Sequence, residues 1–324
     1  MRKWKDHKWI FVLIILVLLV VFVYSIIRVA QNALFKETQS QPISSKTITR
    51  DGVDYFPRQD IDVILLMGID KEGPVQSSGS YNNDGEADTV MLAVFDQTDE
   101  SITIVNLNRD TMVEMPVLGV GGKQAGTIFG QLALSHTYGS GLKDSCENVK
   151  QTVSSLLYGV QIDHYIAMNM SAVALLNDAV GGVKVTVTDD FSEAGSDIPL
   201  GETVLRGQQA IEYIRLRRDV GDQLNLSRME RQNAYMESFL SAFKAEADRS
   251  TGFVVDTYDQ ISEYVVTDCS VNVIDSLVDR YGEYPLKEII SPAGTNRVGD
   301  PYMEFYLDEQ AMDDLILDLL YDPK

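Results

Sequence analysis

The sequence of 324 residues predicts an α/β domain preceded by one transmembrane helix. Three observations lead to this fold class. A long apolar run lies close to the N-terminus, a polar segment rich in Ser, Thr and Gln follows it, and from about residue 60 onward strand patterns alternate with helix patterns. No internal repeat interrupts this alternation, so one folded domain after an anchor is the expected organisation.

The apolar run predicts a transmembrane anchor at residues 9–29. Trp9 to Ile27 is 19 residues without a charge, which at about 1.5 Å per residue is roughly the thickness of a bilayer core. A cleaved signal peptide is the alternative, but its apolar region is typically ~7–15 residues and precedes a small-x-small cleavage site. Residues 30–33 (AQNA) do not provide that site, so we expect an uncleaved anchor.

The distribution of charge predicts the orientation of this anchor. Residues 1–8 (MRKWKDHK) are basic, and the positive-inside rule keeps such a segment in the cytoplasm. The protein is then expected to be a single-pass protein of the cell membrane in a Gram-positive-type envelope. Residues 30–59 would form a linker, and residues 60–324 an extracellular catalytic domain.

Local patterns place the first elements of that domain. Val63 to Met67 is a short apolar run typical of a strand buried on both faces. Two more strands are expected at 88–95 and 102–107, on either side of a turn. Helices are expected near 143–157, 171–180, 207–216, 226–247 and 308–321.

The overall charge excludes one class of partner. The chain carries a net charge of -21, although its first 30 residues are positive. A domain this acidic does not offer the basic surface that nucleic acids require. We therefore expect no nucleic-acid partner, and any anionic ligand must be held by a local group of cations.

Histidines and cysteines give little support to other kinds of site. The chain has three histidines, and His136 and His164 each stand alone in the sequence, which is typical of packed or surface residues. A Ser-His-Asp site is therefore unsupported, and no P-loop or GxGxxG motif is present. Cys146 and Cys269 lack C-x-x-C spacing, and either one disulfide or two unpaired thiols fits them.

Acidic side chains occur at the ends of the predicted strands. Asp70 follows the strand at 63–67, and Asp88 begins the next one. Arg109 and Asp110 end the third strand. Open α/β folds place ligand-binding groups at such positions. Each carboxylate alone also fits a solvated loop charge, but two together could share a hard cation such as Mg²⁺ or Mn²⁺.

Arginines are concentrated in one part of the chain. Six of them fall within 26 residues that contain no lysine: Arg206, Arg215, Arg217, Arg218, Arg228 and Arg231. The planar fork of arginine binds phosphate oxygens in pairs, which lysine does not do. In the helix expected from 226, Arg228, Arg231 and Gln232 are spaced to share one face. A surface helix with salt bridges is the alternative, and the spacing alone leaves both open.

Several motifs follow one another in a fixed order between about residues 60 and 245. They are Asp88-Thr89, NLNRDTMVEMP (106–116), SHTYG (135–139), YGVQIDHYIAMNMSAVALLNDAVGGVKVTV (158–187), LRGQQAIEYIRLRRDVGD (205–222) and SRMERQ (227–232). Taken together, these motifs resemble those of the LytR-CpsA-Psr family of cell-envelope proteins. Several motifs in the family's order are far more specific than any one of them.

The resemblance implies a fold and an activity. The fold is a mixed central sheet flanked by helices, with a pocket for a polyprenyl tail and a diphosphate site at its mouth. Members transfer a glycan phosphate from a polyprenyl (undecaprenyl) diphosphate carrier to a peptidoglycan hydroxyl, which attaches teichoic acids or capsule. The expected partners are therefore a polyprenyl-diphosphate-linked glycan, peptidoglycan and the membrane.

The resemblance also assigns roles to single residues. Asp70 and Asp88 would hold Mg²⁺ or Mn²⁺ on the diphosphate. The side chains that would bind the diphosphate are Arg109, Arg215, Arg217 and Arg228, with Gln232 assisting and Arg231 supporting. The catalytic set would be Asp88, Arg109 and Asp110, where Asp110 either orients Arg109 or serves as the base.

Three positions depart from the family pattern. Glu86-Ala87 stands where the family often has Arg-Ser, Gln131 where a lysine is common, and Asn108 where a proline precedes the arginine. The first two departures remove positive charge from the expected site. This loss leaves open a non-catalytic regulator or scaffold that binds the lipid carrier. A further alternative is a hydrolase that cleaves the polyprenyl diphosphate with water, using the same metal and arginines.

Overall fold

The computed structural model describes residues 47–119, 121–221, 225–250, 252–300 and 302–323. All of these residues belong to one compact unit, Ser44–Lys324. The predicted cytoplasmic segment, the anchor at 9–29 and most of the linker lie outside the described residues. Within the described ranges, no helix is both long enough and apolar enough to cross a membrane.

A mixed central sheet organises the unit. Its strand order is β11 (Val265–Thr267), β8 (His164–Asn169), β3 (Ile61–Ile69), β4 (Ala87–Asp96), β5 (Ser101–Leu107) and β12 (Leu286–Ile290). The β3, β4 and β5 strands are antiparallel neighbours, and β11 is antiparallel to β8. The β8 strand runs parallel to β3, and β12 runs parallel to β5. The predicted mixed sheet is confirmed.

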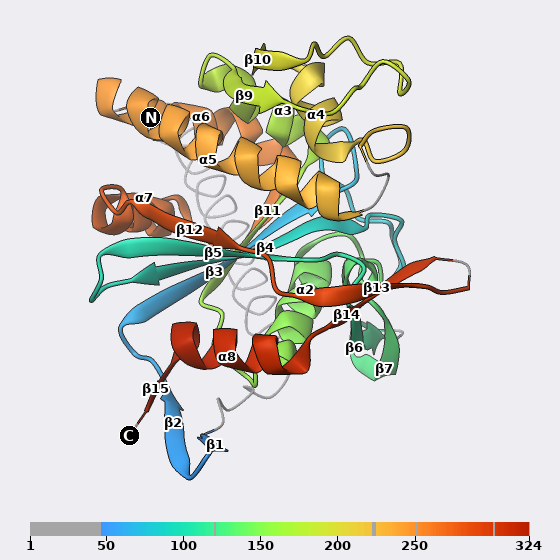
Figure 1. Ribbon diagram of the computed structural model, residues 1–324, viewed down its shortest axis with the longest axis vertical. Coiled ribbons are helices and arrows are strands. Elements are labelled where there is room, and N and C mark those ends of the chain that lie inside the picture. Colours follow the sequence, from blue (N-terminus) through green and yellow to red (C-terminus); the bar gives the residue numbers. More distant parts are fainter. Residues whose placement is uncertain (1–46, 120, 222–224, 251, 301, 324) are drawn as a thin grey trace, which may run out of the picture. The chain divides into compact units, whose positions relative to one another are not determined.

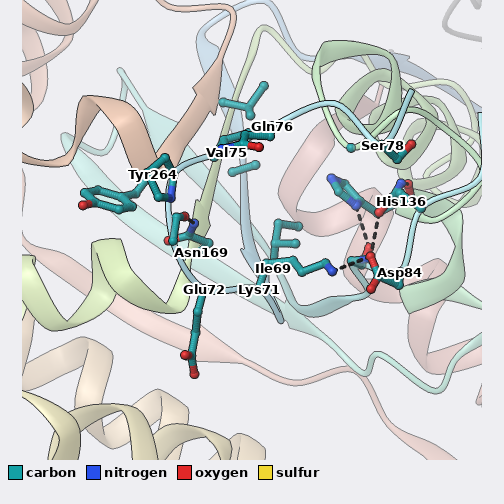
Figure 2. A pocket seen from close by; sticks show the side chains of 17 residues that line it. Ile69, Lys71, Glu72, Val75, Gln76, Ser78, Asp84, His136, Asn169 and Tyr264 are labelled. Carbon is teal, nitrogen blue, oxygen red and sulfur yellow. Dashed lines mark hydrogen bonds and ion pairs between the residues drawn. The ribbon is translucent and has the colours of Figure 1, made fainter. Parts of the chain in front are cut away.

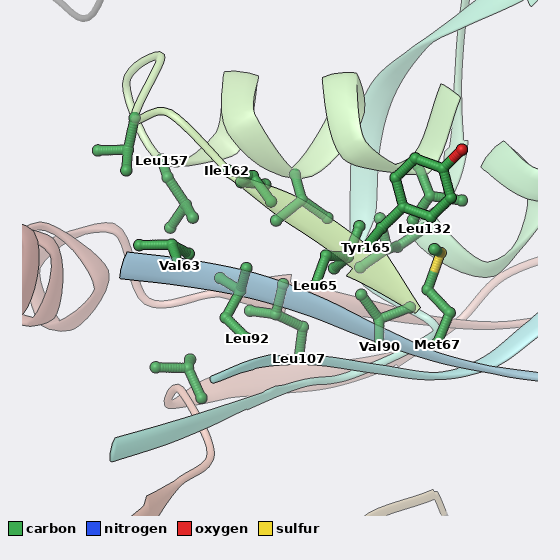
Figure 3. Close-up of a cluster of buried hydrophobic side chains, with 14 of the residues drawn as sticks. Val63, Leu65, Met67, Val90, Leu92, Leu107, Leu132, Leu157, Ile162 and Tyr165 are labelled. Atoms are coloured by element: carbon green, nitrogen blue, oxygen red, sulfur yellow. The ribbon is translucent and has the colours of Figure 1, made fainter. Parts of the chain in front are cut away.

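One face of the sheet carries the larger apolar core. Val63, Leu65 and Met67 of β3 alternate onto this face, as period-2 side chains must in a strand. Helices α2 (Lys143–Leu156) and α8 (Glu309–Leu320) cover it with their buried sides. Figure 3 shows the strand side chains in one cluster beneath α2. Ile64 is also buried, on the opposite face, so β3 is covered on both sides as its apolar run predicts.

The other face is covered by a second group of helices. Helix α5 (Asn225–Arg249) runs along this side, while α2 and α8 lie on the opposite side (Figure 1). Asn106 of β5 joins it to the sheet by donating a hydrogen bond of 2.6 Å to Asn233. Around α5 lie α3 (Met170–Ala179), α4 (Gln208–Arg215), α6 (Phe253–Ile261), β9 (Val183–Val187) and β10 (Gly201–Leu205). A second apolar core joins α4 and α5 to the β9–β10 hairpin.

The remaining elements extend the unit around the sheet. They are β1 (Ile48–Arg50), β2 (Val53–Pro57) and β15 (Tyr321–Pro323), the hairpins β6 (Met112–Leu118)–β7 (Gln124–Gln131) and β13 (Gly294–Val298)–β14 (Met303–Leu307), the 3₁₀ turns η1 (Leu132–His136) and η2 (Ser262–Tyr264), and α7 (Val271–Tyr281). Strand β2 pairs with β15, so the end of the predicted linker contains strands that join the C-terminus.

Candidate functional site

A bulge between β3 and β4 determines the direction of the first acidic side chains of the site. Gly68 pairs with Thr89, but Ile69 pairs with Ala87, which leaves Asp88 as an extra residue in β4. Such a bulge redirects a side chain at the end of a strand. A Cβ on Gly68 would lie 3.1 Å from the Cβ of Thr89, so glycine allows this close approach. Asp70 follows directly, and its N–H donates to the carbonyl of Glu86 at 3.0 Å.

Two arginines converge on Asp88. Arg109 follows β5 and forms ion pairs with Asp88 and Glu86, and its Nε lies 3.4 Å from Asp110. Arg228, in the first turn of α5, places Nη1 3.1 Å from the second oxygen of Asp88. Only 4% of the Arg228 side chain and 11% of the Asp88 side chain are exposed. Segments that are 140 residues apart in sequence therefore meet at one carboxylate.

Asp110 is the most deeply buried carboxylate of the site. Its side chain is 3% exposed, and Gln131 donates a hydrogen bond of 2.8 Å to Oδ1. Arg217 approaches Oδ2 at 3.9 Å. Burial raises the pKa of Asp110, and the nearby Arg109 and Arg217 offset only part of that rise. The side chain is therefore packed between cations and has little access to solvent.

The remaining predicted arginines of the diphosphate site fall on both sides of this group. Arg215, the last residue of α4, pairs with Asp70 at 2.8 Å and approaches Glu72 at 3.7 Å. Its side chain is 42% exposed, so it can change partners. Arg217 is 35% exposed beside Asp110. The structure thus gathers the predicted Asp70, Asp88, Arg109, Asp110, Arg215, Arg217 and Arg228 in one place. Together with Glu72 and Glu86, which pair with two of these arginines, they form what we call the arginine–carboxylate cluster.

Arg231 and Gln232 are held differently from the other predicted ligands. Arg231 is 5% exposed, and its guanidinium donates to the carbonyls of Tyr213 and Leu216 and pairs with Asp189 at 2.6 Å. These contacts fix α5 against α4, which fits the supporting role expected of Arg231. Gln232 donates to Thr89 Oγ1 and to the Ile214 carbonyl, each at 3.1 Å. It therefore lies beside Asp88 on β4.

Acidic and basic groups nearly balance in this cluster. Four arginines (Arg109, Arg215, Arg217 and Arg228) face five carboxylates (Asp70, Glu72, Glu86, Asp88 and Asp110). Burial and the neighbouring arginines lower the pKa of Arg228 to about 9, so it remains cationic at neutral pH. The Nε atoms of Arg109 and Arg228 are buried without a hydrogen-bond partner. Buried donors of this kind are rare, and they indicate a missing acceptor.

Two carboxylates of the cluster suit a divalent cation. Asp70 directly follows β3, Asp88 lies near the start of the antiparallel neighbour β4, and both contact arginines. Each offers hard oxygen donors, while phosphate oxygens and water commonly complete the coordination of Mg²⁺. This donor set fits Mg²⁺ or Mn²⁺ better than a soft metal.

A cavity of about 420 Å³ is lined in part by the residues on either side of Asp70, Ile69 and Lys71, and Figure 2 shows side chains that line it. The loop that follows Asp70 lines it with Lys71, Glu72 and Asp84, and Tyr264 and Asn169 line it from other elements. Glu72 also approaches Arg215, so a side chain that lines the cavity contacts an arginine of the cluster. Its lining mixes polar and apolar groups, and the polyprenyl pocket implied by the resemblance stays a prediction.

The predicted packed role of one histidine is confirmed, and the cysteine alternatives are resolved. His136 is 2% exposed, and its Nδ1 lies 2.7 Å from the carbonyl oxygen of Gly85. Cys146 and Cys269 are both buried free thiols. His164 does not stand alone in space, because it lies close to Asp268 and Cys269.

Several contacts of the site were not predicted from the sequence. Gln131 donates a hydrogen bond to Asp110, and Glu86 forms an ion pair that offsets part of the charge of Arg109. Both residues that depart from the family pattern therefore contact members of the cluster. Asn108 accepts a hydrogen bond of 2.6 Å from Asn225, which in turn accepts one from Arg228. No spacing in the sequence indicates these pairs, since Asn108 and Asn225 are 117 residues apart.

Comparison with known proteins gives consistent matches. The profile of the LytR_cpsA_psr family matches residues 20–316. The polyisoprenyl-teichoic acid–peptidoglycan teichoic acid transferase TagU of Enterococcus faecalis is 30% identical over 240 residues, which cover 72% of this chain and 71% of that protein. The solved structure of a Streptococcus agalactiae protein matches with a TM-score of 0.65 at 22% identity, covering 80% of this chain and 86% of that one. The structure of TagT bound to LI-WTA matches with a TM-score of 0.61 at 19% identity, covering 86% and 97%.

Proposed function

The chain belongs to the LytR-CpsA-Psr family, and we propose that it transfers a glycan phosphate from a polyprenyl diphosphate carrier to a hydroxyl of peptidoglycan. A relative that matches most of the chain carries the name of a teichoic acid transferase that acts on peptidoglycan. The observation that carries the proposal is the convergence of Arg109 and Arg228 on Asp88, each with a buried Nε that has no hydrogen-bond partner.

To bind a diphosphate, the arginines of the cluster must replace some of their present contacts with carboxylates by contacts with phosphate oxygens. Phosphate oxygens accept from guanidinium groups as carboxylates do, and such charge-assisted bonds are about twice as strong as neutral ones. Arg228 retains a buried Nε donor for this purpose, and Arg109 can turn its Nε, 3.4 Å from Asp110, toward the ligand. Arg215 and Arg217 are partly exposed and can turn toward the ligand from Asp70 and Asp110. The site therefore exchanges carboxylate contacts for phosphate contacts.

A divalent cation completes the proposed charge balance. Asp70 and Asp88 would hold Mg²⁺ or Mn²⁺, which would neutralise part of the charge on the diphosphate. Since the carboxylates of the cluster outnumber its arginines, these residues alone do not give a site of net positive charge.

The reaction is a substitution at phosphorus. The acceptor hydroxyl forms a new P–O bond to the glycan-bearing phosphorus, the bond to the bridging oxygen breaks, and polyprenyl phosphate leaves. The proton of the hydroxyl passes to a carboxylate of the site or to water. Catalysis of such a transfer rests on positioning and on neutralising charge, so no protein nucleophile is required.

Asp110 acts as a positioning residue in this proposal. Its side chain is 3% exposed, and Gln131 and the adjacent arginines already surround its oxygens. A general base must come within hydrogen-bond reach of the proton that it removes. The burial of Asp110 favours the first of its two predicted roles, in which it orients Arg109. Arg217, 3.9 Å from Oδ2, lies against the same side chain.

The proposed setting is the outer face of a cell membrane. The predicted anchor at 9–29 would hold the chain in the membrane, with the basic residues 1–8 in the cytoplasm. The described unit would then meet its lipid carrier at the membrane surface and peptidoglycan outside it.

A second candidate function is a non-catalytic receptor for the lipid carrier. The excess of carboxylates over arginines favours it, because Glu86 and Gln131 stand where the family often has cations. Such a receptor would bind the carrier without turning it over.

The proposal is tested by following the carrier with ³¹P NMR. The full-length protein in detergent receives a polyprenyl-diphosphate glycan and Mg²⁺, with or without peptidoglycan fragments. Conversion of the diphosphate resonances to polyprenyl monophosphate only when acceptor is present supports the transferase. The same conversion without acceptor would indicate a hydrolase, and unchanged resonances despite binding would indicate a receptor.

A further inference from the structure

Three potential metal ligands meet at the edge of the central sheet. His164 begins β8, and Asp268 and Cys269 directly follow β11. The two strands are antiparallel, with Thr267 opposite Ile166, so the end of β11 lies beside the start of β8. One ligand atom from each of the three side chains lies within 4.8 Å of the other two. Residues about a hundred positions apart in the sequence thus form one group.

Two of the three distances within this group are close to those of a tetrahedral zinc site. His164 Nδ1 lies 3.4 Å from Asp268 Oδ1, and Cys269 Sγ lies 3.9 Å from the same oxygen. Zn²⁺ bonds of about 2.0–2.3 Å at tetrahedral angles place nitrogen and oxygen ligands about 3.4 Å apart, and sulfur and oxygen ligands about 3.6 Å apart. Shifts of a few tenths of an ångström to about one ångström would bring all three onto one ion.

The state of the three side chains also indicates a missing ligand. The Nδ1 atom of His164 is buried and makes no hydrogen bond, although Asp268 Oδ1 lies 3.4 Å away. The Cys269 residue is only 6% exposed. Backbone and side-chain contacts orient the group: the N–H of Tyr165 donates to Asp268 Oδ1 at 2.9 Å, and the N–H of Cys269 donates to Thr267 Oγ1 at 3.0 Å. Outer contacts of this kind hold metal ligands in place in known sites.

We propose that His164, Asp268 and Cys269 bind one Zn²⁺ ion. Nitrogen, carboxylate oxygen and sulfur together suit this borderline-soft ion, whereas Mg²⁺ does not take a thiolate ligand. Water would supply the fourth position. Binding would release the proton of the Cys269 thiol, since the thiolate is the ligand.

This site is separate from the arginine–carboxylate cluster. His164 pairs with Ile64 at one end of the β3–β8 ladder, and Asn169 pairs with Ile69, next to Asp70, at the other end. Five residue steps along the strand separate the two ends, which is about 17 Å at ~3.3 Å per residue. Bound zinc would therefore not take part in phosphoryl transfer. It would fasten the three-residue edge strand β11 to β8.

Two charged side chains would influence the proposed ion. Lys150 of α2 places Nζ 3.7 Å from Asp268 Oδ2, and it competes with a metal for this carboxylate. Glu147, one turn earlier on α2, is also close enough to Asp268 to influence it electrostatically, and it favours a cation there. The Lys150 side chain is 23% exposed and flexible, so it can turn toward solvent when zinc binds. Removing Lys150 should strengthen zinc binding.

The first test uses Co²⁺ as a spectroscopic substitute for zinc. The full-length protein in detergent, reduced and stripped of metal, is titrated with CoCl₂ and then with ZnCl₂. We expect a thiolate-to-cobalt charge-transfer band that zinc removes at one equivalent. The band should disappear in Cys269→Ala and persist in Cys146→Ala, the matched control for the other buried thiol. Absence of the band in the wild type, or its persistence in Cys269→Ala, would refute the site.

Two further variants separate metal binding from a folding defect. His164→Gln should weaken Zn²⁺ binding at least tenfold, with an unfolding temperature in EDTA close to that of the wild type. Lys150→Ala should tighten Zn²⁺ binding severalfold, because it removes the competing cation. Weaker binding in Lys150→Ala would contradict the proposed geometry. Thermal unfolding with and without ZnCl₂ supplies the second readout, and a rise in Tm is expected only where the cobalt band is present.

Discussion

Replacing Arg109 with alanine removes the side chain that contacts the most carboxylates of the cluster. Arg109 pairs with Glu86 and Asp88 and lies 3.4 Å from Asp110. If it binds the diphosphate, the variant loses a charge-assisted contact of about 1.5–3 kcal/mol. At about 1.4 kcal/mol per factor of ten, kcat/KM should fall about 10- to 150-fold.

The cost to folding should be moderate, because each carboxylate keeps another means of stabilisation. Asp88 retains Arg228, Asp110 retains Gln131 and Arg217, and Glu86 is 39% exposed and can be hydrated. We expect a loss of about 1–3 kcal/mol in the free energy of unfolding, which lowers Tm by up to about 10 °C.

The assay measures polyprenyl phosphate release with acceptor present, beside a thermal unfolding curve. Arg109→Lys keeps the charge but not the planar fork, so its rate should lie between those of the wild type and Arg109→Ala. Arg206→Ala is the matched control, since Arg206 is exposed just before α4 and lies outside the cluster. A folded Arg109→Ala protein with a rate within about twofold of wild type would refute the proposed contact with phosphate, because even 1.5 kcal/mol predicts more.

Three other variants test separate parts of the site. Arg231→Ala should lower the free energy of unfolding in denaturant titrations by about 3–5 kcal/mol, because two buried carbonyls and Asp189 lose their hydrogen-bond and ion-pair partner. An unchanged unfolding midpoint would contradict the structural role of Arg231. The raised pKa of Asp110 means that its protonated form stabilises the fold at low pH, and this contribution is lost as pH rises from about 3.9 through the raised value. Asp110→Asn should remove this decline in stability with rising pH. A pH profile of unfolding identical to that of the wild type would refute the role of Asp110 in the decline. Gln131→Lys adds a cation beside Asp110 and should lower KM for the diphosphate donor severalfold; a higher KM would argue against an anion at this position.

The parts of the fold that depend on local pattern were predictable. The apolar run at 63–67 lies within β3, and the helix expected at 143–157 is α2 to within one residue. The short strand β12 was not predicted, because its five residues carry no clear period and its place beside β5 depends on a partner far away in the sequence. The β6–β7 hairpin was also missed, since most of β7 is exposed and lacks a buried face.

In the candidate site, too, features that depend on residue type and motif were predictable, and features that depend on distant partners were not. The arginines and strand-end carboxylates were predicted by residue type and motif, and the structure brings most of them together. The partners that hold them were not, because Gln131 reaches Asp110 through the return of a hairpin and Asn225 reaches Asn108 from a different layer. Arg231 shares a helix face with Arg228 by spacing, yet the carbonyls at the end of α4 hold its guanidinium. The grouping of His164 with Asp268 likewise depends on strand pairing alone.

The most direct test of the central claim is the mass of the product. The full-length protein is incubated with a polyprenyl-diphosphate glycan, peptidoglycan fragments and Mg²⁺, and the fragments are then analysed by mass spectrometry. For a transferase we expect an adduct joined by a phosphodiester, formed by the wild type, lost with EDTA and strongly reduced in Arg109→Ala. Tight binding of several carriers with no adduct from any of them would contradict this expectation and leave the receptor as the better description.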